Sequence, residues 1–374
     1  MKSKTMGFPL IINGTTEAGT SHSKILYDER NVSQFMASGF VVSDSSPVIL
    51  RKSFEDAIRF EVNALSDGTQ VFVSPIIEHI EGAAVNPIDS ACVLPSLTTD
   101  FEIMERIRTD TIRIAEELGV VGLLNVHYSL KDEDLGVLEI HPRASYTLSF
   151  ASRALGIPLA RVAVKLLTGR KLGEFGLDYE IEPSGIAVKE ATLPFDRFPG
   201  VDPVLGPQPR STGQVMSIDE TFGSAFAKSQ FSIDLPLPST GKIFISVRNR
   251  DKRSIIFIAA KLLDLGFSLI ATEGTARVLS RHGLKVESVY KIAEGRPDVV
   301  DLIKNGEIQL IINTPRGERP RKDLMEIRSQ AVANRVPCIT TISGASAAVF
   351  GIHDLKGKTL QPRSLREYHR VQSR

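Results

Sequence analysis

The chain has little cysteine, almost no net charge and no long apolar run, and each shortage excludes a class of protein. Its two cysteines, Cys92 and Cys338, are too few for a disulfide framework or a cysteine-based zinc site. The 45 basic residues are balanced by 44 acidic ones, which argues against a nucleic-acid or membrane-surface role, because such proteins carry a basic excess. No apolar stretch approaches the roughly 18–20 residues of a membrane span. We therefore expect a protein of a reducing cytoplasm, with no nucleic-acid or membrane partner.

The chain does contain enough apolar sequence for more than one core. Its 374 residues are 42% apolar and 24% charged, which is typical of globular proteins with two or three domains. The first residues, MKSKTMGFPLIING, have a basic start and an apolar run from Phe8 to Ile12. That run is too short for the core of a signal peptide. We interpret it as a strand, in a domain that is expected to begin upstream of this chain.

Short strands and helices alternate in the first half. Strands are expected at 9–12, 47–53, 56–68, 69–81, 121–130 and 135–142, with 69–81 pairing back on 56–68 and 135–142 on 121–130. Helices are expected at 29–38, 98–120 and 147–169, the second capped by Thr98 or Thr99 and ended by Gly119. The Pro- and Gly-rich segment 195–212 is expected to be an ordered surface excursion.

A boundary is expected near SIDLPLPSTG (232–241), after which strands and helices alternate regularly. The strands 242–247, 268–272, 309–314 and 337–341 precede helices at 254–266, 274–283, 322–335 and 344–351. This pattern predicts a parallel sheet with helices on both faces. Ligands bind such sheets at the carboxyl ends of the strands.

Small hydroxyl and amide residues lie at those strand ends, in ATEGTA (271–276), INTPRG (312–317) and TTISGASA (340–347). Thr272 and Thr275 flank a helix start, where free backbone N–H groups favour a phosphate. Ser246, Lys252 and Lys291 could add a hydroxyl and two ammonium groups. In the alternative interpretation, these Thr and Gly residues only cap helices.

These motifs, together with KIAEGRPDVVDLIKNGEIQLIINTPRG, resemble a methylglyoxal-synthase-like domain over nearly all of 240–352. They are most similar to the regulatory domain that ends the carbamoyl phosphate synthetase large subunit. The resemblance implies binding of a nucleotide monophosphate effector such as UMP or IMP. By position, the contacts would be Lys252, Thr272, Thr275, Lys291 and Asn313. The strand ends offer no catalytic aspartate and histidine pair, so catalysis is not expected in this domain.

Upstream, EHIEGAAVNPIDSACVLP, LNVHYSL, LEIHPRAS, FPGVDPVLGPQPRSTGQVMS and AFAKSQ resemble the second ATP-grasp half of the same subunit. The implied fold class is α/β: a partial, mostly antiparallel ATP-grasp domain followed by a doubly wound parallel sheet. Residues 1–235 would form the ATP-grasp part, with a lid remnant at 1–44 and a carboxyl-terminal subdomain and extension at 45–235. Residues 240–374 would form the allosteric domain.

The stretch VLEIHPRASY (137–146) contains a candidate metal ligand. Val137, Leu138 and Ile140 are expected to be buried in a strand from which Glu139 points outward. ATP-grasp chemistry needs magnesium and ATP, and magnesium prefers oxygen ligands. The resemblance makes Glu139 a magnesium ligand.

At the other two ligand positions of the family, this chain has His127 and His141, whose nitrogens suit zinc or nickel better than magnesium. His141 is therefore expected to spoil the magnesium site. Two explanations stay open: drift after loss of selection, or a new transition-metal site at His127, Glu139 and His141. Arg143 is kept as the catalytic arginine of the motif.

Other family positions are changed as well. The resemblance implies phosphate- and ribose-binding groups where this chain has other residues, and several such losses together are expected to abolish synthesis. These positions are Asn13, Arg59, Pro87, Ile88 and Tyr146.

At one set of family positions, this chain keeps the type of residue that the resemblance implies. In some bacterial members ornithine activates the enzyme at the domain junction, and the resemblance places its ligands at Glu81, Asp89, Glu190 and Thr340. Paired carboxylates suit the ammonium groups of a cationic amino acid. The alternative is that Glu81 and Asp89 only hold the junction together.

Three functions follow from these observations. The leading hypothesis is a truncated relative, degenerate for carbamate phosphorylation, that still binds a nucleotide monophosphate and ornithine. The second is one chain of a split, active synthetase completed by a separate amino-terminal chain and a glutaminase subunit. The third is a gene remnant. The sequence leaves open whether arginine or pyrimidine synthesis is served.

Overall fold

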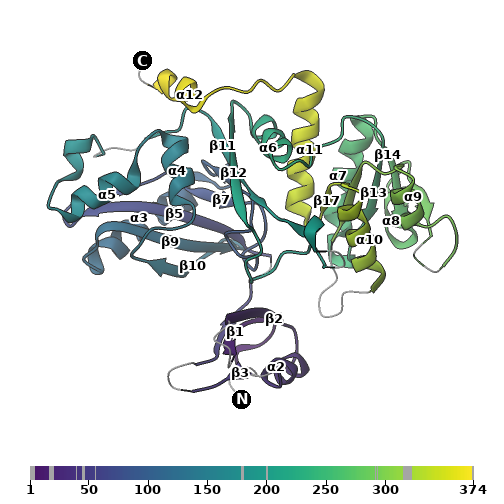
Figure 1. The fold of residues 1–374 in the computed structure, drawn as a ribbon, viewed down its shortest axis with the longest axis horizontal. Helices are drawn as coiled ribbons and strands as arrows, with labels where there is room; N and C mark the ends of the chain where they lie inside the picture. The colour runs from purple at the N-terminus through teal and green to yellow at the C-terminus, as the bar shows by residue number, and fades with distance from the viewer. Residues whose placement is uncertain are drawn as a thin grey trace.

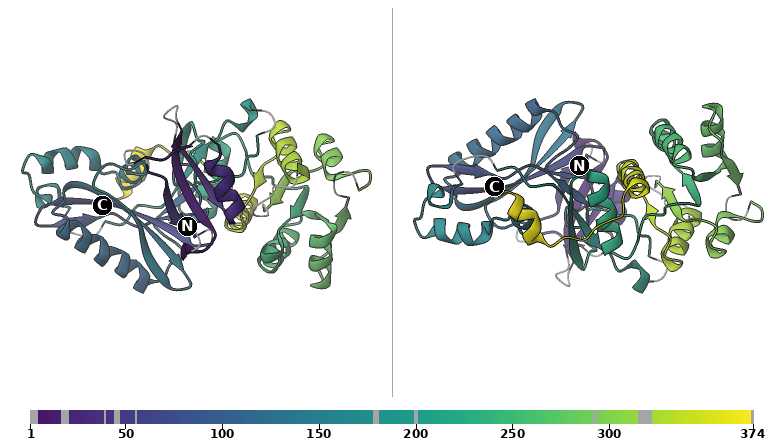
Figure 2. Two further views of the ribbon diagram at one scale, coloured as in Figure 1. Left: turned by 90° about the horizontal axis from the view of Figure 1, so that it is seen from below. Right: turned by 90° about the horizontal axis from the view of Figure 1, so that it is seen from above.

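The computed structural model contains three parts, each built around its own sheet (Figure 1). It describes residues 5–16, 21–38, 40–43, 47–54, 56–177, 181–198, 201–290, 292, 294–314 and 322–372. A small amino-terminal sheet lies beneath a large antiparallel sheet, and a parallel sheet lies beside the large one, as the views in Figure 2 also show. Within the described residues, no helix combines the length and apolarity needed to cross a membrane.

The small sheet has the order β2-β1-β3, with β4 also pairing with β1. Its elements are β1 (Leu10–Thr16), β2 (Ser21–Leu26), α2 (Glu29–Met36), β3 (Phe40–Val41) and β4 (Ile49–Lys52). Ile12, Leu26, Val32 and Phe35 form its core, so the helix packs on one face of the sheet. Strand β4 brings the chain from this sheet to the large one.

The large sheet has the order β10-β9-β5-β7-β8-β11-β12, all antiparallel, with β6 beside β5. The expected pairings of 69–81 with 56–68 and of 135–142 with 121–130 are confirmed. Its strands are β5 (Ile58–Asp67), β6 (Val71–Val73), β7 (Ile77–His79), β8 (Cys92–Leu94), β9 (Val121–Lys131), β10 (Asp134–His141), β11 (Ile186–Thr192) and β12 (Gly213–Asp219).

Helices cover both faces of this sheet, and β5 shows how the sequence divides between them. Phe60, Val62 and Ala64 pack in the core beneath α3 (Phe101–Glu117). Leu65 packs on the opposite face, in the core under α4 (Leu148–Leu155) and α5 (Leu159–Leu167). Because side chains alternate along a strand, the polar residues between Phe60 and Ala64 point away from α3.

Two expectations about these helices are corrected. Helix α3 is capped by Asp100, whose side chain accepts from the N–H of Ile103 at 2.9 Å. Thr98 does not cap the helix, because its backbone N–H and its hydroxyl donate to the Glu78 carboxylate instead. The stretch 147–169 forms two helices, since the chain turns at Gly156, whose φ is +71°.

The parallel sheet has the order β15-β14-β13-β16-β17 and confirms the expected doubly wound architecture. Ile243 and Ile245 pack in a core with α7, α8 and α11, whereas Phe244 packs in a second core with α9 and α10. Its elements are β13 (Lys242–Ser246), α7 (Lys252–Asp264), β14 (Ser268–Thr272), α8 (Glu273–Arg281), β15 (Glu287–Val289), α9 (Val299–Lys304), β16 (Leu310–Asn313), α10 (Lys322–Ala333), β17 (Cys338–Ile339) and α11 (Ile342–Gly357).

The two large parts are packed together through helices. Helix α6 (Phe222–Ser232) follows β12 and shares a core with α11 of the parallel-sheet part. The final helix, α12 (Leu365–Gln372), returns to the antiparallel part (Figure 1). The Tyr368 hydroxyl donates to the Ile218 carbonyl at 2.7 Å, and His369 Nε2 contacts the Arg153 carbonyl at 2.7 Å. These two contacts hold α12 against the antiparallel part.

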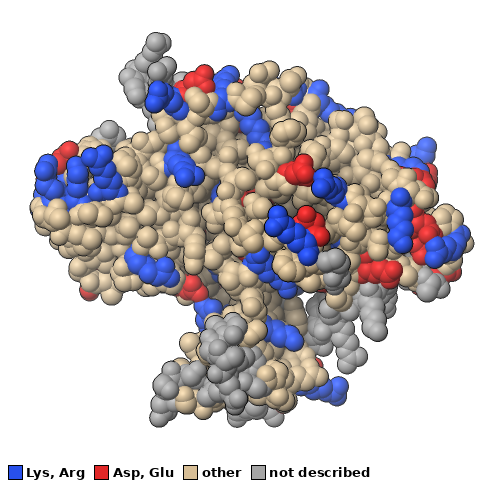
Figure 3. Space-filling model, viewed as in Figure 1, with Lys and Arg blue, Asp and Glu red and all other residues tan. Residues whose placement is uncertain are grey.

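Charges are mixed over the surface. Figure 3 shows acidic and basic side chains interspersed on the viewed face, with one small basic group over α5. This distribution agrees with the near balance of 45 basic and 44 acidic residues.

Candidate functional site

The first candidate site is a cavity of about 320 Å³ on the face of the large sheet that is turned away from α3. Side chains of β4, β5, β9 and β10 reach it, and the loops 83–88, 143–147 and 207–209 close it. The charged and imidazole groups that line it are Arg51, Arg59, Glu61, His127, Glu139, His141 and Arg143.

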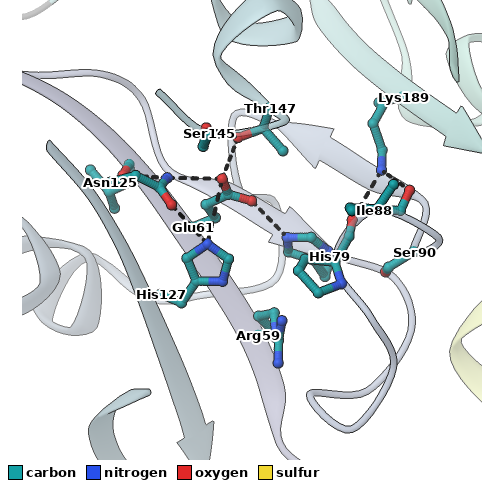
Figure 4. Close-up of polar contacts among 12 residues, drawn as sticks. Arg59, Glu61, His79, Ile88, Ser90, Asn125, His127, Ser145, Thr147 and Lys189 are labelled. Atoms are coloured by element: carbon teal, nitrogen blue, oxygen red, sulfur yellow. Dashed lines mark hydrogen bonds and ion pairs between the residues drawn. The ribbon is translucent and has the colours of Figure 1, made fainter. Parts of the chain in front are cut away.

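Glu61 lies at the centre of a buried polar network (Figure 4). It is 1% exposed and accepts from Asn125 Nδ2 at 2.8 Å and from the Thr147 hydroxyl. His79 Nε2 lies 3.3 Å from one carboxylate oxygen, and His127 Nε2 lies 3.7 Å from the other. Burial raises the pKa of Glu61, but the hydrogen bond from His79 and the charge interaction with His127 outweigh it, so the net pKa lies well below its usual range.

Two histidines lie beside Glu61, and burial lowers the pKa of each. Burial lowers the pKa of His79 to about 4, although Glu61 acts in the opposite direction. Burial also lowers the pKa of His127. The Nδ1 atoms of both rings are buried and have no hydrogen-bond partner. Glu61 is thus surrounded by the Asn125 amide, the Thr147 hydroxyl and the two imidazole rings.

Glu139 lies on β10 at the edge of the sheet. The expectation that its neighbours are buried is wrong, because Val137 is 46% and Ile140 39% exposed. A bulge between Val137 and Glu139 aligns Glu139 with His127 of β9. The Glu139 carboxylate forms an ion pair with Arg51 and lies 3.2 Å from His141 Nε2. Burial raises the pKa of Glu139, but these contacts, with Arg51 first, lower it overall.

A transition-metal site at His127, Glu139 and His141, one of the two explanations left open by the sequence, is not supported. Within the described residues, no group of three or more His, Cys, Asp or Glu side chains is arranged to hold a metal. The His127 and His141 rings lie 5.7 Å apart, and His127 Nε2 contacts the Asn125 carbonyl oxygen at 2.8 Å. Magnesium fits this set poorly too, since Glu139 is its only oxygen donor and already contacts Arg51.

Arg143 also faces the cavity but is exposed, and it donates to the Ala144 carbonyl at 3.1 Å. The loop at 86–88 is held from outside the cavity. Lys189 donates to the carbonyls of Pro87 and Ile88 at 3.2 and 3.1 Å, and Asn86 Nδ2 donates to the Pro207 carbonyl at 3.0 Å. The loop is thus fixed through the carbonyl oxygens of Pro87 and Ile88 and through the Asn86 side chain.

Sequence reasoning missed several residues of this site. Arg51, Glu61, Asn125 and Thr147 line the cavity but were not singled out. The alternation Arg59-Phe60-Glu61 was a usable signal, because two polar residues separated by an apolar one must share a face of the strand.

The second candidate site lies at the carboxyl edge of the parallel sheet. Ser246 Oγ and Thr272 Oγ1 are 3.2 Å apart, and Thr275 Oγ1 accepts from the N–H of Val247 at 3.4 Å. Lys252 Nζ lies 3.5 Å from the position that a Cβ would take on Gly274 at the start of α8.

Asn313, at the end of the neighbouring β16, is completely buried, and its Nδ2 has no hydrogen-bond partner among the residues that the structure describes. The sheet thus brings together Lys252, Thr272, Thr275 and Asn313 as expected from strand order. Lys291 lies outside the described residues.

The proposed ornithine ligands are only partly brought together. Glu81 and Thr340 line a larger cavity of about 1030 Å³ between the three parts, whereas Asp89 and Glu190 do not. Asp89 is 1% exposed and accepts from the backbone N–H groups of Arg210 and Ser211 at 2.7 and 2.9 Å. Asp89 therefore holds the loop after residue 201.

Glu190 is buried, and the charge of the half-buried Glu81 acts on it. Ser90 Oγ and the N–H of Ala91 donate to Glu81, both at 2.7 Å. Gln230 Nε2 donates to Glu190 at 2.7 Å. Burial, followed by repulsion from Glu81, raises the pKa of Glu190 to about 8, and burial also raises the pKa of Glu81. The pair lacks an ion-pair partner within the part of the chain that the structure describes.

One buried contact links the parallel-sheet part to the antiparallel part. Arg328 on α10 is 1% exposed and binds both carboxylate oxygens of Asp202, at 2.7 and 2.5 Å. Its Nη1 donates to Asn313 Oδ1 at 2.7 Å. The second candidate site therefore shares a side chain with the loop that Asp89 holds.

Family models match both parts of the chain. Residues 1–175 match the carbamoyl-phosphate synthase L chain ATP-binding domain, and residues 254–340 match the MGS-like domain. The fold and these matches define the class: a partial ATP-grasp domain joined to a methylglyoxal-synthase-like domain. The chain belongs to the family of carbamoyl phosphate synthase large chains, and corresponds to their carboxyl-terminal section.

Two relatives show the extent of this match. The large chain of Archaeoglobus fulgidus is 44% identical over 367 residues, which are 98% of this chain and 34% of the relative. The carbamoyl phosphate synthase large chain, C-terminal section, of Methanocaldococcus jannaschii is 42% identical over 375 residues, 97% of this chain and 61% of that one. The chain thus spans about a third of the full-length relatives.

Among solved structures, the biotin carboxylase domain of Hydrogenobacter thermophilus 2-oxoglutarate carboxylase, in complex with MgADP, ADP and bicarbonate, matches with a TM-score of 0.47 and 14% identity. The match covers 62% of this chain and 57% of that one.

Proposed function

We propose that this chain is an effector-binding carboxyl-terminal section of a carbamoyl phosphate synthase large chain whose ATP-grasp pocket does not phosphorylate carbamate. The observation that carries the proposal is the state of Glu139, which contacts Arg51 and His141 instead of facing an open oxygen-lined site. A magnesium ion there would have to displace Arg51 and would find imidazole nitrogens beside it.

The effector would be a nucleotide monophosphate such as UMP or IMP, bound at the carboxyl edge of the parallel sheet. The start of α8 offers free N–H groups to a phosphate, with the Lys252 ammonium group beside Gly274. The unpaired Nδ2 of buried Asn313 supplies a further donor for the ligand. Lys291, which lies outside the described residues, is included among the proposed nucleotide contacts because of the sequence resemblance.

A cationic amino acid such as ornithine would bind at the junction. The carboxyls of Glu81 and Glu190 have raised pKa values, and an ammonium group between them would stabilise their ionised form. Thr340, which lines the same cavity as Glu81, would accept or donate one hydrogen bond. Asp89 would act indirectly, by holding the 202–211 loop.

Calorimetric titration of UMP and IMP into the purified chain tests the proposal. We expect Lys252→Gln to weaken binding by about tenfold or more, as loss of a charge-assisted hydrogen bond would. Lys261→Gln, an exposed lysine of the same helix, should bind as the wild type does. Failure of the wild type to bind either nucleotide, or equal binding by Lys252→Gln, would overturn the effector assignment.

A second candidate function is one chain of a split, active synthetase. It is favoured by the Methanocaldococcus relative, which is itself named a C-terminal section. In that case a separate amino-terminal chain and a glutaminase subunit would complete the enzyme. ADP release that requires all three chains together would support this candidate over the first.

A further inference from the structure

Arg59 is a buried cation with an incomplete set of partners. It lies on β5 beside Glu61, is 8% exposed, and lines the 320 Å³ cavity. Its Nη2 donates to the Ala83 carbonyl at 2.6 Å, but its buried Nε has no hydrogen-bond partner in the described part of the chain. In Figure 4 no contact joins Arg59 to the other residues drawn. A buried guanidinium with an unmade hydrogen bond is costly unless something else accepts it.

The carboxylates of the cavity are already engaged elsewhere. Glu139 pairs with Arg51, and Glu61 receives donors from Asn125, Thr147 and His79. Within the described chain, neither Arg59 nor Arg143 forms an ion pair with a carboxylate. The charges of Glu61 and Glu139 act on Arg59, but the three guanidinium groups that line the cavity outnumber these two carboxylates.

A negative ligand would complete this arrangement. Guanidinium groups bind phosphate oxygens through paired N–H donors. The volume of about 320 Å³ is at the small end of ligand cavities, which run from roughly 300 to 1,000 Å³. The poor fit to magnesium means that the protein itself must neutralise the ligand.

We propose that this cavity is a metal-independent site for a small phosphorylated ligand, whose phosphate oxygens accept hydrogen bonds from Arg59 and Arg143. The ligand class is a phosphate ester or pyrophosphate, not a magnesium nucleotide. This inference rests on the proposed function, because it takes the ATP-grasp pocket to be free of magnesium-ATP chemistry. Glu61, fixed on the cavity floor, repels any anion that enters beyond Arg59.

The test is calorimetric titration of inorganic pyrophosphate into the full chain, once in EDTA and once with excess Mg²⁺. Binding should occur in EDTA and should weaken when Mg²⁺ sequesters the ligand. Arg59→Gln and Arg143→Gln should each weaken binding by about tenfold or more. Arg161→Gln, an exposed arginine of α5 outside the cavity, should not change it.

Arg143→Gln keeps the test decisive if Arg59→Gln does not fold, because Arg143 is exposed and has no buried contact. No binding of pyrophosphate by the wild type up to millimolar concentration overturns the inference, as does unchanged affinity in Arg143→Gln. These results leave the proposed function intact. Tight ATP binding that requires Mg²⁺ would instead overturn the proposed function.

Discussion

The buried contact of Arg328 with Asp202 gives the sharpest test of how the two large parts are held together. Arg328→Met keeps the length and apolar character of the side-chain stem but removes three hydrogen bonds, two of them to a carboxylate. Breaking a buried ion pair by deleting one partner typically costs about 3–5 kcal/mol, since the other charge is left uncompensated. We expect a loss in this range, because Arg328 is 1% exposed and the Asp202 side chain only 17%.

A second arginine provides the matched control. Arg335, just after α10, pairs with Asp234 at 3.5 Å, but the two side chains are 77% and 86% exposed. Arg335→Met should therefore cost no more than about 1 kcal/mol. Urea unfolding of both variants measures the difference, and hydrogen exchange of the 202–211 amides should accelerate only in Arg328→Met.

The reasoning would be refuted if Arg328→Met and Arg335→Met lost the same stability. A double variant with Asp202→Asn gives the pairwise term directly. If the losses of the two single variants simply add, Arg328 and Asp202 do not stabilise one another.

Three further variants test other parts of the account. Burial and repulsion from Glu81 raise the pKa of Glu190 to about 8, against an ordinary value of 4.5. The native state therefore binds an extra proton between these two values, and the free energy of unfolding falls as pH rises through this window. Glu190→Gln should flatten this fall in urea unfolding measured over pH, and an unchanged slope would contradict the assignment. Asp100→Ala removes the cap on the Ile103 N–H and should cost about 1 kcal/mol in thermal unfolding, whereas no loss would show that the cap is dispensable. Gly223→Ala would place a Cβ 2.4 Å from the Phe350 carbonyl oxygen, between α6 and α11. This clash should lower the free energy of urea unfolding by roughly 1–3 kcal/mol. An unchanged stability would mean that these helices separate easily.

The parallel-sheet part could be predicted from the sequence because its signals are local. Each strand, such as 242–247, is a continuous apolar run followed by a helix with small or hydroxyl residues at its start. Parallel order then places Thr272 and Asn313 at one edge without further information.

The burial of individual strands could not be predicted in the same way. The sequence LGVLEIH is as apolar as a core strand, yet β10 lies at the edge of the sheet, so that Val137 and Ile140 are exposed. Position within a sheet depends on pairing between distant segments, which periodicity does not encode.

The sequence also did not predict which of several possible hydrogen-bond and ion-pair partners a side chain takes. Thr98 is a good helix cap by type, but Glu78 from β7 binds it and Asp100 takes its place. Arg51 from β4 reaches Glu139 across 88 residues of sequence. The resemblance to ATP-grasp enzymes identified Glu139, and only the fold brought its counter-charge to it.

The most direct test of the central claim is calorimetric titration of ATP into the purified chain, with and without Mg²⁺, after UMP or IMP binding has shown that the sample is folded. We expect that Mg²⁺ does not strengthen ATP binding, and that Mg-ATP binds no more tightly than about 1 mM, near −4 kcal/mol. Micromolar binding of Mg-ATP, near −8 kcal/mol, that is lost in EDTA would show that Glu139 still serves a magnesium nucleotide and would contradict the account.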